Sequence, residues 1–327
     1  MAPQLNDFES ATALKDDPSA AIFSEGWEDK KARIKKASPF GALPGWDLLS
    51  VVVKAGCDMR QEQLACQLIE EMHDIWNMSG LPIWVAPLRI LVAGSGEGGL
   101  METARNAISL HSIKKAALSC RRAVIDESQP PPPFTLRDYY IKTFGSPDSD
   151  GFINARDAFM KSLVGYSLVT YLLQLRDRHN GNILVDAAGH VIHIDFGFML
   201  AVSPGGGTYY GLESAPFKLT AEYIDLLGGL YSEPFAAFKD LVYQGFMALR
   251  RHADRLLLLL EISQKDSNLA CFGGAGPSVI AQMRQRLQPG LSEYQVKLFV
   301  DRLVTGSAYN LFTRLYDSFQ YYSNGIL

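Results

Sequence analysis

The feature that most constrains this chain is the stretch 176–197, RDRHNGNILVDAAGHVIHIDFG. Two short apolar runs, 183–185 and 191–194, flank an Asp-Ala-Ala-Gly turn, and this pattern predicts a β-hairpin. Because the open ends of the two strands of a hairpin lie together, we expect Asn182 and Asp195 at one end of the ribbon. Amide and carboxylate oxygens in such a place suit Mg²⁺ that is carried by nucleotide phosphates.

The spacing of the polar residues is a second and stronger signal. Asn182 follows Asp177 by five residues, and Asp195 follows Asn182 by thirteen, directly before Phe-Gly. Protein kinases have an Asp, an Asn and an Asp-Phe-Gly in the same order. His179 adds a side chain that can accept or donate a proton. A surface hairpin with a polar turn is the plainer interpretation, but this set of residues around a strand, a turn and a strand favours phosphoryl transfer.

Several motifs carry a family resemblance. Asp-Arg-His-Asn-Gly-Asn-Ile-Leu (177–184) and His-Ile-Asp-Phe-Gly-Phe (193–198) resemble the lipid kinases of the phosphoinositide 3- and 4-kinase superfamily. Ala-Pro-Phe-Lys-Leu-Thr (215–220), Leu-Leu-Gly-Gly (226–229) and the segment from Tyr316 to the last residue narrow it, because they are similar to the phosphatidylinositol 4-kinases of type III beta. The resemblance runs from about residue 13 to residue 327.

The resemblance implies an α+β fold, the bilobal protein-kinase-like lipid kinase fold, with a small sheet-rich N-lobe and a mostly helical C-lobe. We expect a flexible lead-in over 1–25, the N-lobe and hinge over 26–104, and the C-lobe over 105–327, with a proline-rich loop at 126–134. Apolar periodicity predicts helices over 60–76, 155–175, 220–228, 233–250, 252–264, 277–287, 292–304 and 307–322.

Two charged residues near the start of the N-lobe are candidates for work on ATP. The β-branched run 48–54 predicts a strand that ends on Lys54. A lysine on a buried strand needs a partner or a ligand, and the resemblance gives Lys54 the ATP phosphates. Glu62 lies in the first turn of the next predicted helix and is expected to pair with Lys54. An acid is also favoured at a helix N-terminus for its own sake.

The basic run 30–36 precedes the turn Ser-Pro-Phe-Gly. Such a run is either a solvated face or, as the resemblance favours, a strand that leads into the loop over the ATP phosphates. Ser38 and backbone N–H groups would then contact the phosphates. This sequence has no Lys in that turn, although class I phosphoinositide 3-kinases carry one there.

The segment 94–99 fits Gly-x-Gly-x-x-Gly, a pattern typical of dinucleotide binding between a strand and a helix. No acidic residue ends a second strand about twenty residues later, so the dinucleotide interpretation is the weaker one. The resemblance instead implies a glycine-rich turn that leads to the hinge. It places Met101 beside the adenine and has Glu102 and Ala104 offer backbone groups to the adenine edge.

Substrate choice is indicated by the segment after Asp-Phe-Gly. No Lys or Arg occurs between Phe196 and Phe217, and the first cation is Lys218. An inositol ring that already carries phosphates needs several cations to hold it. The segment therefore favours unphosphorylated phosphatidylinositol, whose phosphodiester Lys218 is expected to meet unless it is an ordinary surface lysine.

The function implied by the resemblance is ATP-dependent phosphorylation of phosphatidylinositol on the inositol 4-hydroxyl, which gives phosphatidylinositol 4-phosphate. Mg²⁺, or Mn²⁺ in its place, would be held by Asn182 and Asp195. Either Asp177 or His179 would accept the proton of the hydroxyl. The alternatives are a Ser/Thr protein kinase of the related large-kinase family, a non-catalytic kinase-like module and, more distantly, a dehydrogenase.

Composition bounds the partners and the compartment. A net charge of −4 does not fit the strongly basic footprint of a nucleic-acid-binding protein. The four cysteines lack metal-ligand spacing and, together with a polar first segment, indicate a cytoplasmic protein. The resemblance adds a peripheral membrane location, at the Golgi, and small GTPases or adaptor proteins as partners. Apolar residues at helical spacing in 307–322 are expected to pack in the core or, as the resemblance implies, to lie against the bilayer.

Overall fold

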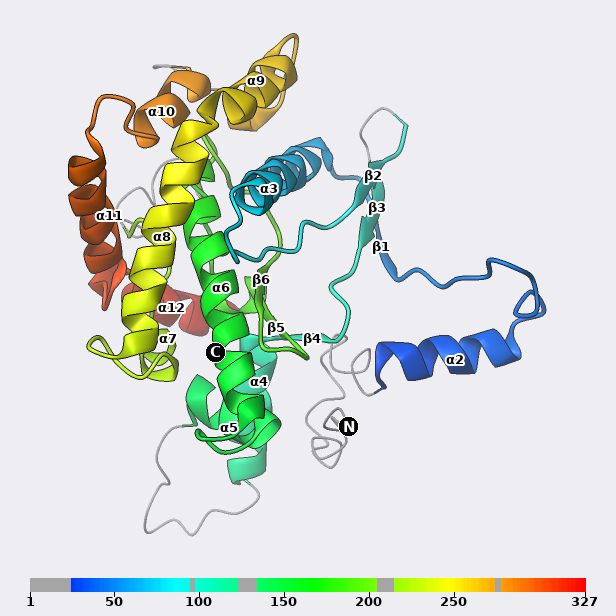
Figure 1. Ribbon diagram of the computed structural model, residues 1–327. Coiled ribbons are helices and arrows are strands. Elements are labelled where there is room, and N and C mark those ends of the chain that lie inside the picture. The colour runs from blue at the N-terminus through cyan, green and yellow to red at the C-terminus, as the bar shows by residue number, and fades with distance from the viewer. Residues whose placement is uncertain (1–24, 95–97, 123–133, 205–214, 274–277) are drawn as a thin grey trace.

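The computed structural model describes residues 25–94, 98–122, 134–204, 215–273 and 278–327. The predicted lead-in and the predicted proline-rich loop lie outside these ranges except for the last residue of each, and so do residues 205–214 of the substrate segment. The chain begins with a helix and an open sheet and continues into a body made mainly of helices (Figure 1).

A first antiparallel sheet has the strand order β1-β3-β2, formed by β1 (Val51–Ala55), β3 (Gly98–Glu102) and β2 (Ile90–Val92). Lys54 pairs with Gly99 across β1 and β3. β2 and β3 form a hairpin, so the Gly-x-Gly-x-x-Gly segment joins two antiparallel strands and does not lead from a strand into a helix. The dinucleotide interpretation is therefore wrong.

A second antiparallel sheet has the order β4-β5-β6 and contains the predicted hairpin. β5 (Ile183–Asp186) and β6 (Val191–His193) pair with Ile183 opposite His193, which confirms the hairpin. Asp186 closes the turn, because its carboxylate accepts from the backbone N–H groups of Ala188 and His190 at 2.9 and 2.8 Å. β4 (Ala107–Ser109) adds a third strand that the sequence pattern did not indicate.

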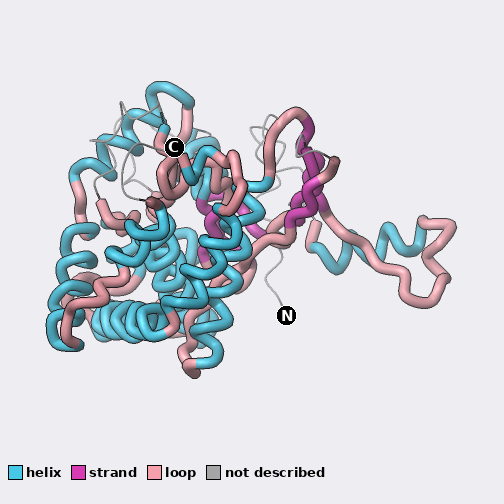
Figure 2. Tube along the Cα trace, turned by 90° about the horizontal axis from the view of Figure 1, so that it is seen from above, coloured by secondary structure: helices cyan, strands magenta, loops and turns pink. Residues whose placement is uncertain are grey.

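The chain passes from the first sheet to the second between the end of β3 and the start of β4. The two sheets stand apart, and the helices gather around the second (Figure 2). This is the bilobal α+β arrangement that the sequence predicts, and the crossing lies where the hinge was expected. The exact lobe bounds stay a prediction.

The helical body is built on α6 (Asp150–Leu173), which is buried on nearly all sides over its second half. Gly165 allows this burial, because a Cβ there would lie 2.6 Å from the carbonyl oxygen of Trp84. The helices of the body are α4 (Leu110–Arg122), α5 (Leu136–Phe144), α6, α7 (Ala221–Leu226), α8 (Glu233–Arg251), α9 (Ala253–Gln264), α10 (Val279–Arg286), α11 (Glu293–Ser307) and α12 (Leu311–Asn324), with short 3-10 turns at η3 (Asn180–Asn182) and η5 (Ala270–Phe272).

The N-lobe helix α3 (Arg60–Met78) packs between the first sheet and the helical body. Its buried face carries the predicted apolar positions, including Leu64, Leu68 and Met72. The indole N–H of Trp76 donates to the carbonyl oxygen of Gly245 in α8 at 3.1 Å. The helix thus joins the lobes at one end and, as described below, reaches the active site at the other.

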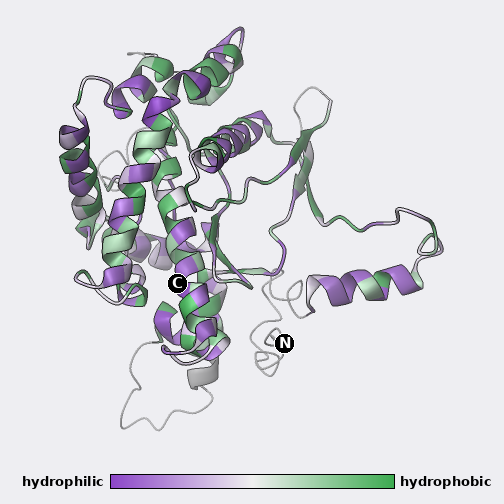
Figure 3. Ribbon diagram, in the orientation of Figure 1, coloured by the Kyte–Doolittle hydropathy of each residue, from purple (hydrophilic) through white to green (hydrophobic). Residues whose placement is uncertain are grey.

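The basic run forms a helix, α2 (Trp27–Ala37), so the prediction of a strand is wrong. Its residues are mostly good helix formers, with Glu28 and Asp29 in the first turn and lysines in the last, as the helix dipole favours. Trp27 is its one buried residue. Figure 3 shows a largely hydrophilic helix, and α2 with the connection to β1 extends away from both sheets.

The last helix, α12, has two unlike faces. Its two buried residues, Tyr316 and Gln320, have side chains that end in polar groups. The apolar and aromatic side chains of this segment, for which packing in the core was one expectation, are exposed instead. They are Leu311, Phe312, Leu315, Phe319, Tyr321 and Tyr322. Within the described ranges, no helix has both the length and the apolar character that crossing a bilayer requires.

Candidate active site

The hairpin brings Asn182 and Asp195 to one end of the second sheet. The backbone N–H of Ile194 donates to the carbonyl oxygen of Asn182 at 3.1 Å, which continues the pairing of β5 and β6 by one residue. Asp195 is the next residue along the chain and is exposed, whereas Asn182 is buried. The structure therefore places the two predicted metal ligands side by side in the backbone register.

The backbone at this end of the hairpin is strained and held by Arg178. Asp195 and Asp177 have φ angles of +60° and +62°, a left-handed conformation that non-glycine residues rarely adopt. The buried guanidinium of Arg178 donates to the carbonyl oxygens of Ile194, at 2.8 Å, and of Asp195. Asn182 is oriented in turn, because its amide nitrogen donates to the carbonyl oxygen of Asp177 at 3.0 Å.

The carboxylate of Asp177 has two different oxygens. Its Oδ1 accepts hydrogen bonds from the hydroxyl of Tyr316 and from the amide of Gln320, at 3.3 Å, both on α12. Its Oδ2 faces Nε2 of His179 at 3.7 Å, which is too long for a hydrogen bond. One oxygen is thus fixed by the last helix, and the other lies next to the histidine.

His179 is held in its neutral form with a defined tautomer. Burial lowers its pKa, the neighbouring charges of Arg178 and Lys218 lower it further, and Asp177 only partly opposes them. Its Nδ1 accepts the backbone N–H of Gly181 at 3.1 Å. A ring nitrogen that accepts a hydrogen bond carries no proton, so the proton of neutral His179 is on Nε2, toward Asp177.

Lys54 and Glu62 form the ion pair that the sequence predicts. The ammonium of Lys54 lies 2.9 and 3.1 Å from the two carboxylate oxygens of Glu62. Burial is the largest influence on the pKa of Lys54 and lowers it, but the hydrogen bond to Glu62 and the charges of Glu62 and Asp195 together raise it above its ordinary value. The charge of Asp195 acts in the same direction as that of Glu62, and the contacts of Gln61 described below join the helix of Glu62 to the end of the hairpin.

The hinge residues lie where the chain leaves the first sheet. Met101 pairs with Val52 and with Ile90 in the middle of that sheet. The backbone N–H of Glu102 already donates to the carbonyl oxygen of Arg89 at 2.9 Å, so it is not offered to a nucleotide. The backbone N–H of Ala104 donates no hydrogen bond within the part of the chain that the structure describes. Ala104 is therefore the better supported of the two adenine contacts.

Two of the predicted contacts are not brought to this site. Ser38 ends α2, where its hydroxyl accepts the backbone N–H of Phe40 at 3.2 Å, and this segment extends away from the hairpin. Its assignment to the ATP phosphates rested on a strand that the structure replaces with a helix. Lys218 is buried, and its ammonium is used by three partners in the protein, so it does not face a lipid phosphate.

The donor set at the hairpin suits a metal that arrives with phosphates. The amide nitrogen of Asn182 is occupied by the carbonyl of Asp177, which leaves the amide oxygen for a cation. Asp195 uses Oδ1 to accept the backbone N–H of Gly197 at 3.2 Å and keeps Oδ2. One amide and one carboxylate oxygen are few ligands for a protein cage, but they fit Mg²⁺ that keeps phosphate oxygens and water as its other ligands.

The structure adds residues that the sequence analysis missed. The amide of Gln61, next to Glu62, donates to the carbonyl oxygens of Phe196 and Gly197 at 3.2 and 2.7 Å, and so joins α3 to the Asp-Phe-Gly segment. Tyr316 and Gln320 contact Asp177 from α12. A weak signal was present, because the two residues are four apart in the helix and so share one face.

Comparisons with known proteins agree with this geometry. A model of the family described as phosphatidylinositol 3- and 4-kinase matches residues 49–272. The chain is similar to phosphatidylinositol 4-kinase pik1 of Schizosaccharomyces pombe, with 46% identity over 95% of the chain and 36% of that protein. It is 43% identical to phosphatidylinositol 4-kinase beta of Homo sapiens and of Rattus norvegicus, over 97% of the chain and 36% of each relative. The chain thus spans about a third of the length of these relatives.

Proposed function

The chain belongs to the phosphatidylinositol 3- and 4-kinase family, and from this membership we propose that it transfers the γ-phosphoryl group of ATP to the 4-hydroxyl of phosphatidylinositol. The observation that carries the proposal is that Gln61, next to Glu62 of the Lys54–Glu62 ion pair, donates to the carbonyl oxygens of Phe196 and Gly197, which follow Asp195 at the end of the hairpin. Phosphoryl transfer depends on positioning and on stabilisation of charge. The ammonium of Lys54, held by Glu62, together with the amide of Asn182 and the carboxylate of Asp195, supplies both.

On the nucleotide side, Lys54 contacts the phosphates of ATP while Glu62 keeps its ammonium in place and charged. Asn182 and Asp195 would hold Mg²⁺, with Mn²⁺ as the alternative metal. When bound, the metal neutralises charge on the phosphate oxygens. Arg178 keeps the carboxylate of Asp195 aimed at this position through its hydrogen bonds to the backbone on either side.

On the lipid side, Asp177 and His179 divide the proton work. Oδ1 of Asp177 accepts hydrogen bonds from α12 and Oδ2 faces His179, so we assign acceptance of the proton of the inositol hydroxyl to Oδ2. The proton on Nε2 of His179 makes that nitrogen a donor, suited to an oxygen of the transferring phosphoryl group. The geometry therefore favours Asp177 as the base, between the two candidates that the sequence left open.

The choice of lipid is supported by what the chain lacks. No Lys or Arg occurs from Phe196 to Phe217, and the ammonium of Lys218 is used inside the protein. An inositol ring that already carries phosphate groups would meet no cation from this segment. We therefore propose phosphatidylinositol itself as the substrate. The names of the relatives support the 4-hydroxyl as the acceptor.

Membrane contact follows from α12. Its exposed apolar residues lie on the same helix as Tyr316, which bonds Asp177. A bilayer that received Leu311, Phe312 and Leu315 would therefore present lipid beside the site. We propose a peripheral location on cytoplasmic membranes, with the Golgi as the first candidate. Small GTPases and adaptor proteins stay predicted partners.

The proposal is tested by incubating the protein with Mg-ATP labelled at the γ-phosphate and phosphatidylinositol in detergent micelles. The product's phosphate position is then determined by chromatography of the deacylated head group. Phosphatidylinositol 4-phosphate is the expected product. A 3-phosphate product would overturn the choice of hydroxyl, and labelling of a protein substrate run in parallel, without lipid product, would favour the protein kinase alternative.

A further inference from the structure

Lys218 lies in an unusual environment for a lysine. Only 5% of its side chain is exposed, and burying an ammonium is unfavourable unless all of its hydrogens find acceptors. Here the ammonium donates to the carbonyl oxygen of Arg178 at 3.1 Å, to Oδ1 of Asn180 at 3.1 Å and to Oδ1 of Asp317 at 2.7 Å. The three donors of a lysine thus have three acceptors.

The backbone around Lys218 is anchored independently of that ammonium. The N–H of Phe217 donates to the hydroxyl of Ser307 at 3.3 Å, and Leu219 forms a bridge with Ala308, both near the end of α11. Phe217 and Leu219 are themselves buried. The backbone that carries Lys218 is therefore held in place, so its ammonium can restrain the positions of the groups that accept its hydrogen bonds.

Two of its three acceptors flank His179 in the chain. Arg178 offers its carbonyl to Lys218, while its guanidinium holds the carbonyl oxygens of Ile194 and Asp195. The side chain of Asn180 bonds Lys218 through its oxygen and the carbonyl of Leu327 through its nitrogen, at 2.8 Å. One buried ammonium therefore sets the position of the turn that carries His179 relative to Asp195.

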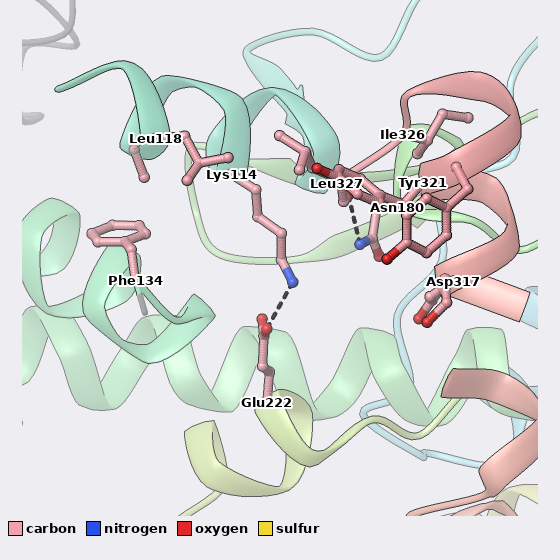
Figure 4. A pocket seen from close by; sticks show the side chains of 12 residues that line it. Lys114, Leu118, Phe134, Asn180, Glu222, Asp317, Tyr321, Ile326 and Leu327 are labelled. Atoms are coloured by element: carbon pink, nitrogen blue, oxygen red, sulfur yellow. Dashed lines mark hydrogen bonds and ion pairs between the residues drawn. The ribbon is translucent and has the colours of Figure 1, made fainter. Parts of the chain in front are cut away.

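The third acceptor links this turn to α12. Asp317 follows Tyr316, so α12 is joined to Asp177 through Tyr316 and Gln320 and to the Arg178–Asn180 turn through Lys218. Asn180 and Asp317 line a cavity of about 410 Å³ together with the Lys114–Glu222 ion pair (Figure 4). Lys218 bonds both side chains from the protein side, and Asn180 is also held by the carbonyl oxygen of Leu327.

We propose that Lys218 is a positioning residue, which holds the Arg178–Asn180 turn of the catalytic loop in register with Asp195 and couples that turn to α12 through Asp317. The proposal rests on the proposed function for its kinetic consequence but not for its structural one. Lys218 touches neither lipid nor nucleotide, so its loss should impair the transfer step and leave ATP binding by Lys54 and Glu62 intact.

The test compares Lys218→Met with wild type by steady-state kinetics and by hydrogen exchange of backbone amides. Methionine keeps much of the volume and removes all three hydrogen bonds. We expect kcat to fall by about 10²-fold, as a misplacement of catalytic groups by about 1 Å can cause, with KM for ATP unchanged. Amides in 178–182 should exchange faster, while those in the middle of α6 should not.

Lys114→Met is the matched control. Lys114 lines the same cavity, but its ammonium pairs with Glu222 at 2.7 Å and forms no hydrogen bond with the described residues of the catalytic loop. Its loss should leave kcat and the exchange of 178–182 unchanged. Asp317→Asn is the second variant in case Lys218→Met does not fold. It keeps the two loop contacts of Lys218 and weakens the link to α12, so kcat should fall below that of wild type, and an unchanged kcat in this variant would contradict the coupling to α12.

Several results would overturn the proposal. A folded Lys218→Met with wild-type kcat would do so, and so would exchange that increases evenly across the helical body. Equal losses in Lys114→Met would show a general effect of the cavity region. If the wild-type protein phosphorylates no lipid, the proposed function fails, but the exchange pattern of 178–182 still decides whether Lys218 positions the loop.

Discussion

The hydroxyl of Tyr316, in the last helix, donates a hydrogen bond to Oδ1 of Asp177, in the loop before the catalytic hairpin. The two residues are 139 positions apart in the chain. The same helix exposes Leu311, Phe312 and Leu315 on another face. The hydrogen bond from Tyr316 thus joins the helix proposed to meet lipid to the carboxylate proposed to accept the lipid's proton. This contact is therefore tested first among the variants of α12.

Tyr316→Phe removes the hydroxyl and keeps the ring. We expect kcat to fall by about tenfold, which corresponds to the loss of about 1.4 kcal/mol from one hydrogen bond to a charged group. KM for ATP should not change, because Lys54 and Glu62 are untouched. Tyr322→Phe, on an exposed tyrosine of the same helix, is the control. Equal kcat values in wild type and Tyr316→Phe would show that the contact has no catalytic role.

The Lys54–Glu62 ion pair is best tested by a double-mutant cycle. Lys54→Met and Glu62→Gln are each expected to lower kcat/KM for ATP by about 10²-fold or more, because Lys54 acts on the phosphates and Glu62 acts through Lys54. The double variant should be hardly worse than Lys54→Met alone. Additive losses would mean that Glu62 has a separate role.

An exposed ion pair on the same helix provides the comparison. Arg60 and Asp58 lie 2.6 Å apart and are both exposed to solvent. Arg60→Met should change the free energy of unfolding by less than about 1 kcal/mol and leave kcat/KM unchanged. The measurements are urea unfolding and the lipid kinase assay, carried out on all four variants together.

Gln61 connects the N-lobe helix to the Asp-Phe-Gly segment through two carbonyl oxygens. Gln61→Ala should loosen that segment, so amides in 196–199 are expected to exchange about fivefold faster, the equivalent of about 1 kcal/mol. Gln63→Ala is a matched change, since the amide of Gln63 bonds Ile90 in the N-lobe sheet at 2.9 Å. The prediction fails if both variants alter 196–199 equally.

Much of the active site followed from local patterns. The hairpin was predictable because two short apolar runs around an Asp-Ala-Ala-Gly turn specify a strand, a turn and a strand over fewer than twenty residues. The Lys54–Glu62 pair was predicted from the resemblance to kinases, which pair a strand lysine with a glutamate of the next helix. Helix bounds in the second half of the chain came out within a few residues, since their apolar periodicity is strong.

What failed depended on contacts between distant parts of the chain. The sequence near Lys218 does not indicate that its side chain is buried, because the acceptors of its hydrogen bonds lie 38 to 99 positions away in the chain. The run at 30–36 was interpreted either as a solvated face or as a strand, and its residue types favour the largely exposed helix α2. Gln61 was overlooked because a glutamine in a helix gives no signal until its partner, the Asp-Phe-Gly segment, is in view.

The cysteines provide a test of the fold that does not depend on activity. Burial raises the pKa of the Cys66 thiol to about 12 and that of Cys271 to about 11, whereas Cys57 is exposed. At pH 8 the reactive thiolate of Cys66 is about one part in ten thousand. Iodoacetamide should therefore modify Cys57 and spare Cys66 and Cys271, even when the pH is raised to 9. Peptide mass spectrometry of the native protein checks this, and rapid labelling of Cys66 would contradict its burial.

The most direct test of the central claim, that the end of the hairpin performs phosphoryl transfer to phosphatidylinositol, is the rate of lipid product formation by wild type and by Asp195→Asn in one assay. Asn keeps the size of the side chain and removes the charge that the metal needs. The account predicts that wild type forms phosphatidylinositol 4-phosphate and that the rate of the variant is lower by at least about 10³-fold. The melting temperature of the variant should be unchanged. Normal turnover by a folded Asp195→Asn would contradict it.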